Sequence, residues 1–118
     1  MATNQVYNHG DQFDVVCSEP ATPSSGDPVL VGQLPGVALT DENADGTTTV
    51  KFNGVYDFPV KGETTTNAAI AVGDILYYDA AATPHKLNKD NTNGVRFGYA
   101  LEAVSSGATN TIRVKIGY

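Results

Sequence analysis

Apolar and polar residues alternate along most of this chain, most clearly at its C-terminal end. Ile112, Val114 and Ile116 occupy every second position, with polar or charged residues between them. Successive side chains of a β-strand point to opposite faces, so a period of two predicts a strand with one buried and one solvated face. We therefore expect a strand in the final segment, residues 111–116.

The preceding segment predicts a second strand. Phe97, Tyr99 and Leu101 share one face, and the opposite face carries Arg96, Gly98, Ala100 and Glu102. The Ser- and Gly-containing loop 105–110 separates the two predicted strands, which favours an antiparallel hairpin. A similar hairpin is predicted earlier in the chain, from strands at 36–40 and 48–52 joined by a loop at 41–46.

Three short blocks occur twice in the same order. The pairs are 26–31 with 73–78, 36–39 with 98–101, and 50–52 with 114–116. Duplication and chance similarity both remain open, because glycine and aspartate commonly begin a strand. In both copies one face of the first strand of the hairpin is made mainly of Gly and Ala. Small side chains favour the close approach of a second sheet or a neighbouring subunit, and a merely solvated face is the alternative.

Glycine, proline and polar clusters divide the remaining sequence. Segments 18–26 and 80–94 read as surface loops, the second with a short strand at 85–87. Asn53-Gly54 is compatible with a two-residue turn, but we favour a bulge in one bent strand over 48–60. The Ala-rich stretch 67–72 gives the one indication of a helix. Together these patterns predict an all-β fold, a compact antiparallel β-barrel or β-sandwich, with a flexible N-terminal arm at 1–10 and a single domain at 11–118.

Composition narrows the possible functions. The chain has 118 residues, which suits one domain, and its seven basic and thirteen acidic residues give a net charge of -6. Because nucleic-acid binding normally requires a basic stripe and the basic residues are scattered, we expect no nucleic-acid partner. The N-terminus lacks a basic start and an apolar stretch, so we expect no signal peptide, no membrane span and synthesis in the cytoplasm.

The sequence offers no recognisable catalytic centre. It contains no phosphate-binding Gly-x-x-x-x-Gly-Lys loop and no Gly-x-Ser-x-Gly turn. His9 and His85 stand in polar surroundings without companions at metal-ligand spacing, which favours solvated loop positions. Cys17 lies in an alternating segment and is expected to be a small buried residue. We therefore expect no enzymatic activity and no cofactor.

One loop has the residue types of a cation site. Asp41, Asn43 and Asp45, followed by Gly46, match the opening of an EF-hand calcium loop. However, Phe52 stands where the bidentate glutamate belongs, and the flanking segments read as strands. We favour a hairpin loop whose Asp and Asn side chains bond to their own backbone.

Several of these segments resemble the capsid cement, or head decoration, proteins of tailed bacteriophages. The resemblance covers nearly the whole chain and is carried by the order and spacing of residues 26–40, 54–59, 73–79 and 98–102. The Thr-rich stretch 61–67 and the insertion at 84–94 depart from the family pattern and affect expected surface contacts more than the fold.

The resemblance implies an all-β subunit of the virion, made in the host cytoplasm and bound to the outside of the head. Its implied partners are the major capsid protein and two further copies of itself, as a homotrimer. The expected means of attachment are unpaired sheet edges, which can accept a strand from a neighbour, and a polar arm that orders on the shell. The capsid-contact residues expected in this arm are Ala2, Thr3, Asn4, Gln5, Val6 and Tyr7, and simple disorder of the arm is the alternative. A carbohydrate or host-surface binding module is the alternative: six tyrosines favour it, and the lack of Trp speaks against it.

Overall fold

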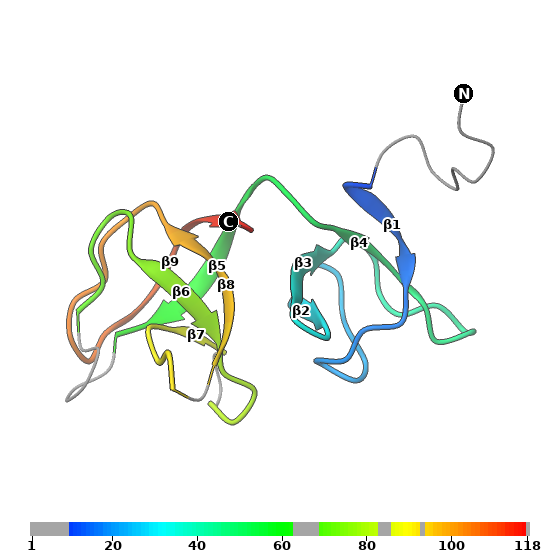
Figure 1. Ribbon diagram of the computed structural model, residues 1–118, viewed down its shortest axis with the longest axis horizontal. Helices are drawn as coiled ribbons and strands as arrows, with labels where there is room; N and C mark the ends of the chain where they lie inside the picture. Colours follow the sequence, from blue (N-terminus) through cyan, green and yellow to red (C-terminus); the bar gives the residue numbers. More distant parts are fainter. Residues whose placement is uncertain (1–9, 63–68, 83–85, 93, 118) are drawn as a thin grey trace.

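The computed structural model describes residues 10–62, 69–82, 86–92 and 94–117, which form β-strands and connecting loops. The strands belong to two sheets that lie side by side (Figure 1). We call residues 10–53 the sheet half and residues 54–117 the barrel half. The predicted all-β fold is therefore confirmed, with a barrel as the architecture of the second half.

The sheet half contains four strands in the order β1-β4-β3-β2. All three pairings are antiparallel. The predicted first hairpin is confirmed, since β3 and β4 are neighbours joined by the loop that contains 41–46. The strands are β1 (Gln12–Val15), β2 (Pro28–Val31), β3 (Leu34–Ala38) and β4 (Thr48–Lys51).

The barrel half is a closed barrel in the order β5-β7-β6-β8-β9. Its pairings are antiparallel except for the parallel contact between β5 and β7, where Val60 is opposite Leu87. The predicted second hairpin is confirmed as β8 and β9, and the short strand expected near 85–87 is β7. The strands are β5 (Val55–Lys61), β6 (Ile75–Tyr78), β7 (Leu87–Asn88), β8 (Val95–Ala100) and β9 (Thr109–Ile116).

The two halves repeat one backbone arrangement. Gly26 and Gly73 both have a φ of 90°. The Gly26 amide donates to the Ala38 carbonyl, and the Gly73 amide donates to the Ala100 carbonyl, each at 2.7 Å. The following aspartates also correspond. Asp27 Oδ2 accepts from the Ser24 amide, and Asp74 Oδ2 accepts from the Ala71 amide. Strand pairing follows the same correspondence, with β1, β4, β3 and β2 equivalent to β5, β9, β8 and β6. The repeated blocks of the sequence thus form one repeated structural unit.

The predicted shared face of Phe97, Tyr99 and Leu101 is wrong because β8 contains a bulge. Leu76 of β6 pairs with Gly98 of β8, and the next residue of β6, Tyr77, pairs with Arg96. Phe97 is therefore an extra residue in β8. A bulge shifts the alternation of the strand that contains it. Phe97 and Ala100 are therefore fully buried, while Leu101 is 38% exposed.

Two further expectations at strand ends are corrected. Asn53-Gly54 is neither a hairpin turn nor a bulge in one strand, because β4 and β5 belong to different sheets and this dipeptide links them. Gly54 has a φ of 105°, which permits the change of direction. The predicted helix at 67–72 is wrong in its described part, since Ile70 instead forms an isolated antiparallel bridge with Val104.

Small residues in the paired strands allow a neighbouring strand of the same sheet to approach. A Cβ on Gly98 would overlap the carbonyl oxygen of Lys115 in β9. At the equivalent Gly36 it would lie 2.5 Å from Val50 Cγ1 and 3.0 Å from the Lys51 carbonyl oxygen. The expectation of a second sheet or a neighbouring subunit at these positions is thus corrected: β4 and β9 make the close approach.

The buried side chains form two clusters. The smaller cluster, inside the sheet half, is Cys17, Val29, Ala38 and Val50. The larger cluster fills the barrel around residues such as Phe58 and Phe97, whose rings meet edge to face with centroids 5.7 Å apart. Leu30 and Val37 of the sheet half are also members of this larger cluster. Apolar packing therefore joins the two halves.

Candidate interaction surface

The predicted capsid-contact residues Ala2 to Tyr7 lie outside the described residues, as do His9 and His85. The described chain begins at Gly10, directly before β1. The predicted contact arm therefore stays a prediction. The surfaces, pocket and side-chain clusters of the described residues remain as candidates for function.

In the loop with cation-site residue types, the carboxylate oxygens of Asp41 and Asp45 accept hydrogen bonds from the protein itself. Asp45 Oδ1 accepts from the Thr47 amide at 3.0 Å and from the Thr47 hydroxyl at 2.7 Å. These hydrogen bonds lower the pKa of Asp45. Asp41 Oδ1 accepts from the Ser25 amide at 2.8 Å. Among the described residues no group of three or more His, Cys, Asp or Glu side chains is placed to hold a metal ion. Asp45 bonds to the backbone of its own loop, as the favoured interpretation expected, whereas Asp41 bonds to the backbone of another loop and Asn43 Nδ2 donates to the Thr47 hydroxyl.

Cys17 is buried in the cluster of the sheet half, as predicted. Burial is the largest cause of the raised pKa of its thiol. A buried thiol with a raised pKa is a poor nucleophile at neutral pH. Packing therefore accounts for this side chain.

A pocket of about 270 Å³ lies between the two halves. Asp27 Oδ2 in its wall accepts from the Ser24 amide, and Lys86 Nζ donates to the Ala80 carbonyl at 2.9 Å. Burial raises the pKa of Tyr78 to about 12, so its hydroxyl keeps its proton at neutral pH. These polar groups maintain local structure around the pocket. Its lining residues are Pro20, Gly26, Asp27, Pro28, Pro59, Tyr78 and Lys86.

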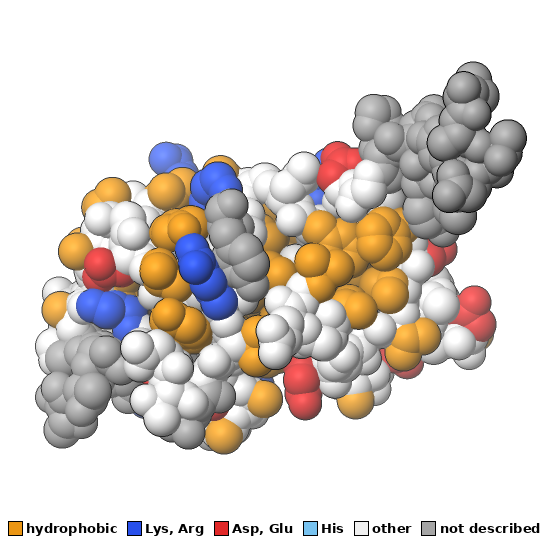
Figure 2. Space-filling view, in the orientation of Figure 1, with side chains coloured by type: hydrophobic (Ala, Val, Ile, Leu, Met, Phe, Trp, Pro, Cys, Tyr) orange, Lys and Arg blue, Asp and Glu red, His pale blue; other side chains and the backbone are white. Residues whose placement is uncertain are grey.

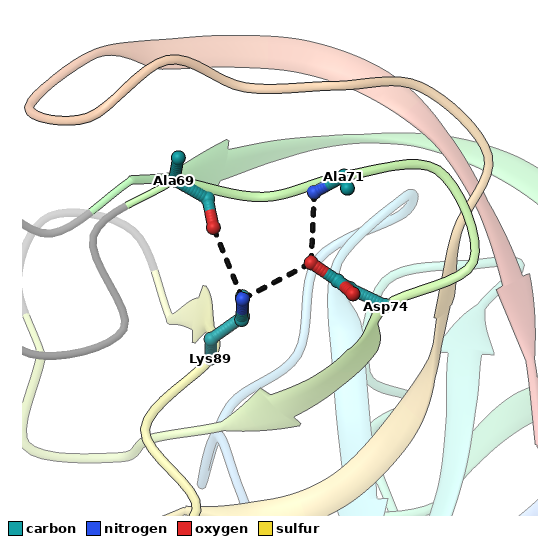
Figure 3. Close-up of polar contacts among 4 residues, drawn as sticks. All are labelled: Ala69, Ala71, Asp74 and Lys89. Carbon is teal, nitrogen blue, oxygen red and sulfur yellow. Dashed lines mark hydrogen bonds and ion pairs between the residues drawn. The ribbon is translucent and has the colours of Figure 1, made fainter.

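A lysine fixes the long loop of the barrel half to the start of β6 (Figure 3). Lys89 Nζ lies 3.0 Å from Asp74 Oδ2 and donates to the Ala69 carbonyl at 3.0 Å. The same carboxylate accepts from the Ala71 amide at 2.8 Å. The Ala71 hydrogen bond and then Lys89 lower the pKa of Asp74. The equivalent Asp27 accepts the corresponding backbone hydrogen bond from Ser24, and among the described residues no lysine forms an ion pair with it.

The outer surface of the barrel carries a basic and aromatic group of side chains. The ring of Tyr99 lies 5.5 Å from the Arg96 guanidinium carbon and 6.0 Å from Lys115 Nζ. Arg96 also donates to the Tyr99 hydroxyl. In the space-filling view, basic side chains gather over the barrel half, while acidic side chains lie mainly over the sheet half (Figure 2).

These basic residues were visible in the sequence, but their grouping was not. They looked scattered because Arg96, Arg113 and Lys115 lie on two strands separated by a loop. Pairing of Tyr99 with Lys115 brings β8 and β9 together. The β6 partners Ile75 and Tyr77 add apolar and aromatic area to the same face, opposite Tyr99 and Arg96.

Comparison with known proteins gives one positive finding. A family model described as phage cement protein matches residues 7–116. Comparisons with curated proteins and with solved structures found no match. Among the described residues, no helix is long and apolar enough to cross a bilayer.

Proposed function

The chain belongs to the phage cement protein family, and on this premise we propose that it is a non-enzymatic virion subunit that binds the outer surface of the assembled head. Its partner there is the major capsid protein, and it ties neighbouring capsid subunits together. The family match over nearly the whole chain is the observation that carries this proposal. The fold is consistent with it, since the described buried side chains form two apolar clusters and a basic and aromatic group lies on the outer surface of the barrel.

A homotrimer is the proposed working form. Three linked copies that bind neighbouring capsid subunits make the second and third contacts intramolecular, so modest individual interfaces give strong retention. A ligand that binds the intact shell and not its separated subunits also stabilises the shell by mass action. Strong head stabilisation therefore does not require a large contact area from each copy.

The arm from Ala2 to Tyr7 is the proposed capsid-contact segment. A polar segment that becomes ordered on its partner can cover a large surface while leaving the folded domain unchanged. We place residues 11–118, which follow the N-terminal arm at 1–10, in a single domain. The Leu30 and Val37 side chains support this division, because they pack into the cluster of the barrel.

The test measures binding to expanded heads that lack this protein. We expect the full chain to co-sediment with the heads and raise their disassembly temperature. A variant that starts at residue 8 should keep the same melting temperature in isolation and lose most of its head binding. Failure of the full chain to bind would refute the capsid role, whereas full binding by the truncated chain would refute only the role of the arm.

A glycan array with the same purified protein tests the alternative function, a carbohydrate or host-surface binding module. Retained glycan binding together with absent head binding would favour the carbohydrate-binding module. The structure gives little support to carbohydrate binding, because the Tyr99 ring is already contacted by Arg96 and Lys115.

A further inference from the structure

A row of outward-facing residues crosses four strands of the barrel. Val55 is opposite Lys115, Lys115 is opposite Tyr99, and Tyr99 is opposite Ile75. Directly opposite residues of neighbouring strands place their side chains on the same face. Val55 is 51% exposed, although it is a large apolar residue. This row therefore presents apolar, basic and aromatic side chains side by side.

Two arginines extend the row into a surface. Arg96 contacts the Tyr99 ring. Arg113 is exposed two positions before Lys115, on the same face of β9. Tyrosine and arginine are enriched among the residues that dominate binding energy in protein interfaces. We define the barrel outer face as Val55, Ile75, Arg96, Tyr99, Arg113 and Lys115. Asp57, directly opposite Arg113, is an exposed acidic residue on the same side of the sheet.

The internal repeat shows how the equivalent face of the sheet half is used. Strand register makes Pro28 equivalent to Ile75, and Val37 equivalent to Tyr99. Val37 is only 3% exposed and packs in the cluster of the barrel. Pro28 lines the same pocket as Pro59 of β5. Within one chain, the barrel half thus buries Val37, whereas the equivalent Tyr99 of the barrel is only partly buried.

The repeat also identifies the residue of the sheet half that corresponds to Pro59. Thr48 of β4 is equivalent to Ile112 of β9, and these two residues lie opposite Val15 and Phe58. Val15 is therefore equivalent to Phe58, and the next residue, Val16, is equivalent to Pro59. Val16 is 64% exposed. Asp14 and Glu19, close to it in sequence, are also exposed.

The two halves of the chain differ in net charge. Residues 1–53 contain seven acidic residues and one basic residue, a net charge of -6. Residues 54–118 contain six of each, a net charge of zero. A basic patch on the neutral half of one copy is thus complementary to the acidic half of another. Such complementarity directs two surfaces together and suppresses wrong pairings.

We propose that the barrel outer face binds the sheet half of a second copy of this chain, around Val16, Asp14 and Glu19. By the repeat, Val16 occupies the position in the sheet half that Pro59, which lines the pocket between the halves, occupies in the barrel half. The proposed contact is a head-to-tail contact between two different surfaces, and such contacts close into rings when the rotation between copies permits. This inference rests on the proposed homotrimer and specifies its interface.

The test uses two paired charge reversals. Arg113→Glu with Lys115→Glu reverses the barrel outer face, and Asp14→Lys with Glu19→Lys reverses the opposing surface. By analytical ultracentrifugation, the wild type should sediment at three times 12.4 kDa. Each paired variant should sediment as a 12.4 kDa monomer at the same concentration. The variant with all four reversals should regain the trimer, because the two surfaces are again complementary.

Lys61→Glu with Lys86→Glu is the matched control, with the same change of net charge outside the barrel outer face, and it should remain trimeric. Circular dichroism and thermal melting confirm that each variant is folded. If the wild type is monomeric, the homotrimer fails and this contact fails with it. If the wild type is trimeric, two results would show that only the proposed interface is wrong. One is a folded paired variant that is still trimeric, and the other is a fourfold variant that stays monomeric. A barrel-face variant that remains trimeric but loses head binding would assign this face to the capsid protein and also overturn the inference.

Discussion

At the scale of single residues, Gly98 sets the distance between β8 and β9. Any side chain there would meet the Lys115 carbonyl oxygen, a backbone atom that cannot move without shifting β9. We expect Gly98→Ala to lower the free energy of unfolding by about 3 kcal/mol, the upper part of the range for overpacking. Chemical denaturation followed by circular dichroism measures the change.

Gly10→Ala is the control for this substitution. A Cβ at Gly10 would have no atom of the described residues within 4 Å, so the stability of this variant should match the wild type within about 0.5 kcal/mol. Equal stability of the Gly98 and Gly10 variants would contradict the close approach of β9.

At the scale of elements, the ion pair of Lys89 and Asp74 holds the loop before β8 to the start of β6. We expect Lys89→Met to lower the free energy of unfolding by about 0.5–1 kcal/mol, since both partners are partly solvated. Asp74 has a lowered pKa in the folded protein, so its stabilisation is present above its unfolded pKa of 3.8. It is lost as the pH falls through the lowered folded value. Denaturation at pH 7 and at pH 2.5 measures the difference.

Lys86→Met provides the comparison, because the Lys86 ammonium donates to the Ala80 carbonyl, an uncharged acceptor. Its effect on stability should be similar at both pH values. An effect of Lys89→Met that is equally large at pH 2.5 would show that the ion pair is not its cause.

At the scale of the whole molecule, shared packing should make the two halves unfold together. Leu30 and Val37 pack in the barrel cluster, so separating the halves would expose buried apolar surface. We expect one transition, with the same midpoint for the reactivity of the buried Cys17 thiol in the sheet half and for tyrosine signals dominated by the barrel half. Leu30→Ala should shift both midpoints equally, and its cost should be about 2–5 kcal/mol. Two separated midpoints in the wild type would contradict a single domain.

The sequence by itself determined the local elements. Alternation identified β9, the hairpins β3-β4 and β8-β9 followed from alternation and intervening loops, and the repeated Gly-Asp blocks marked the repeated unit. These features depend on neighbours within a few residues, where side-chain period and turn chemistry are sufficient. For the same reason the burial of Cys17 was predictable.

Only the tertiary structure decided how these elements close and what their outer faces present. The parallel contact of Val60 with Leu87 closes the barrel, and the bulge at Phe97 turns Tyr99 outward beside Arg96 and Lys115. The candidate interaction surface was therefore not visible in the sequence, because it combines strands far apart along the chain. Such pairings are selected by the fit of the whole core, which no local period of hydrophobic and polar residues specifies.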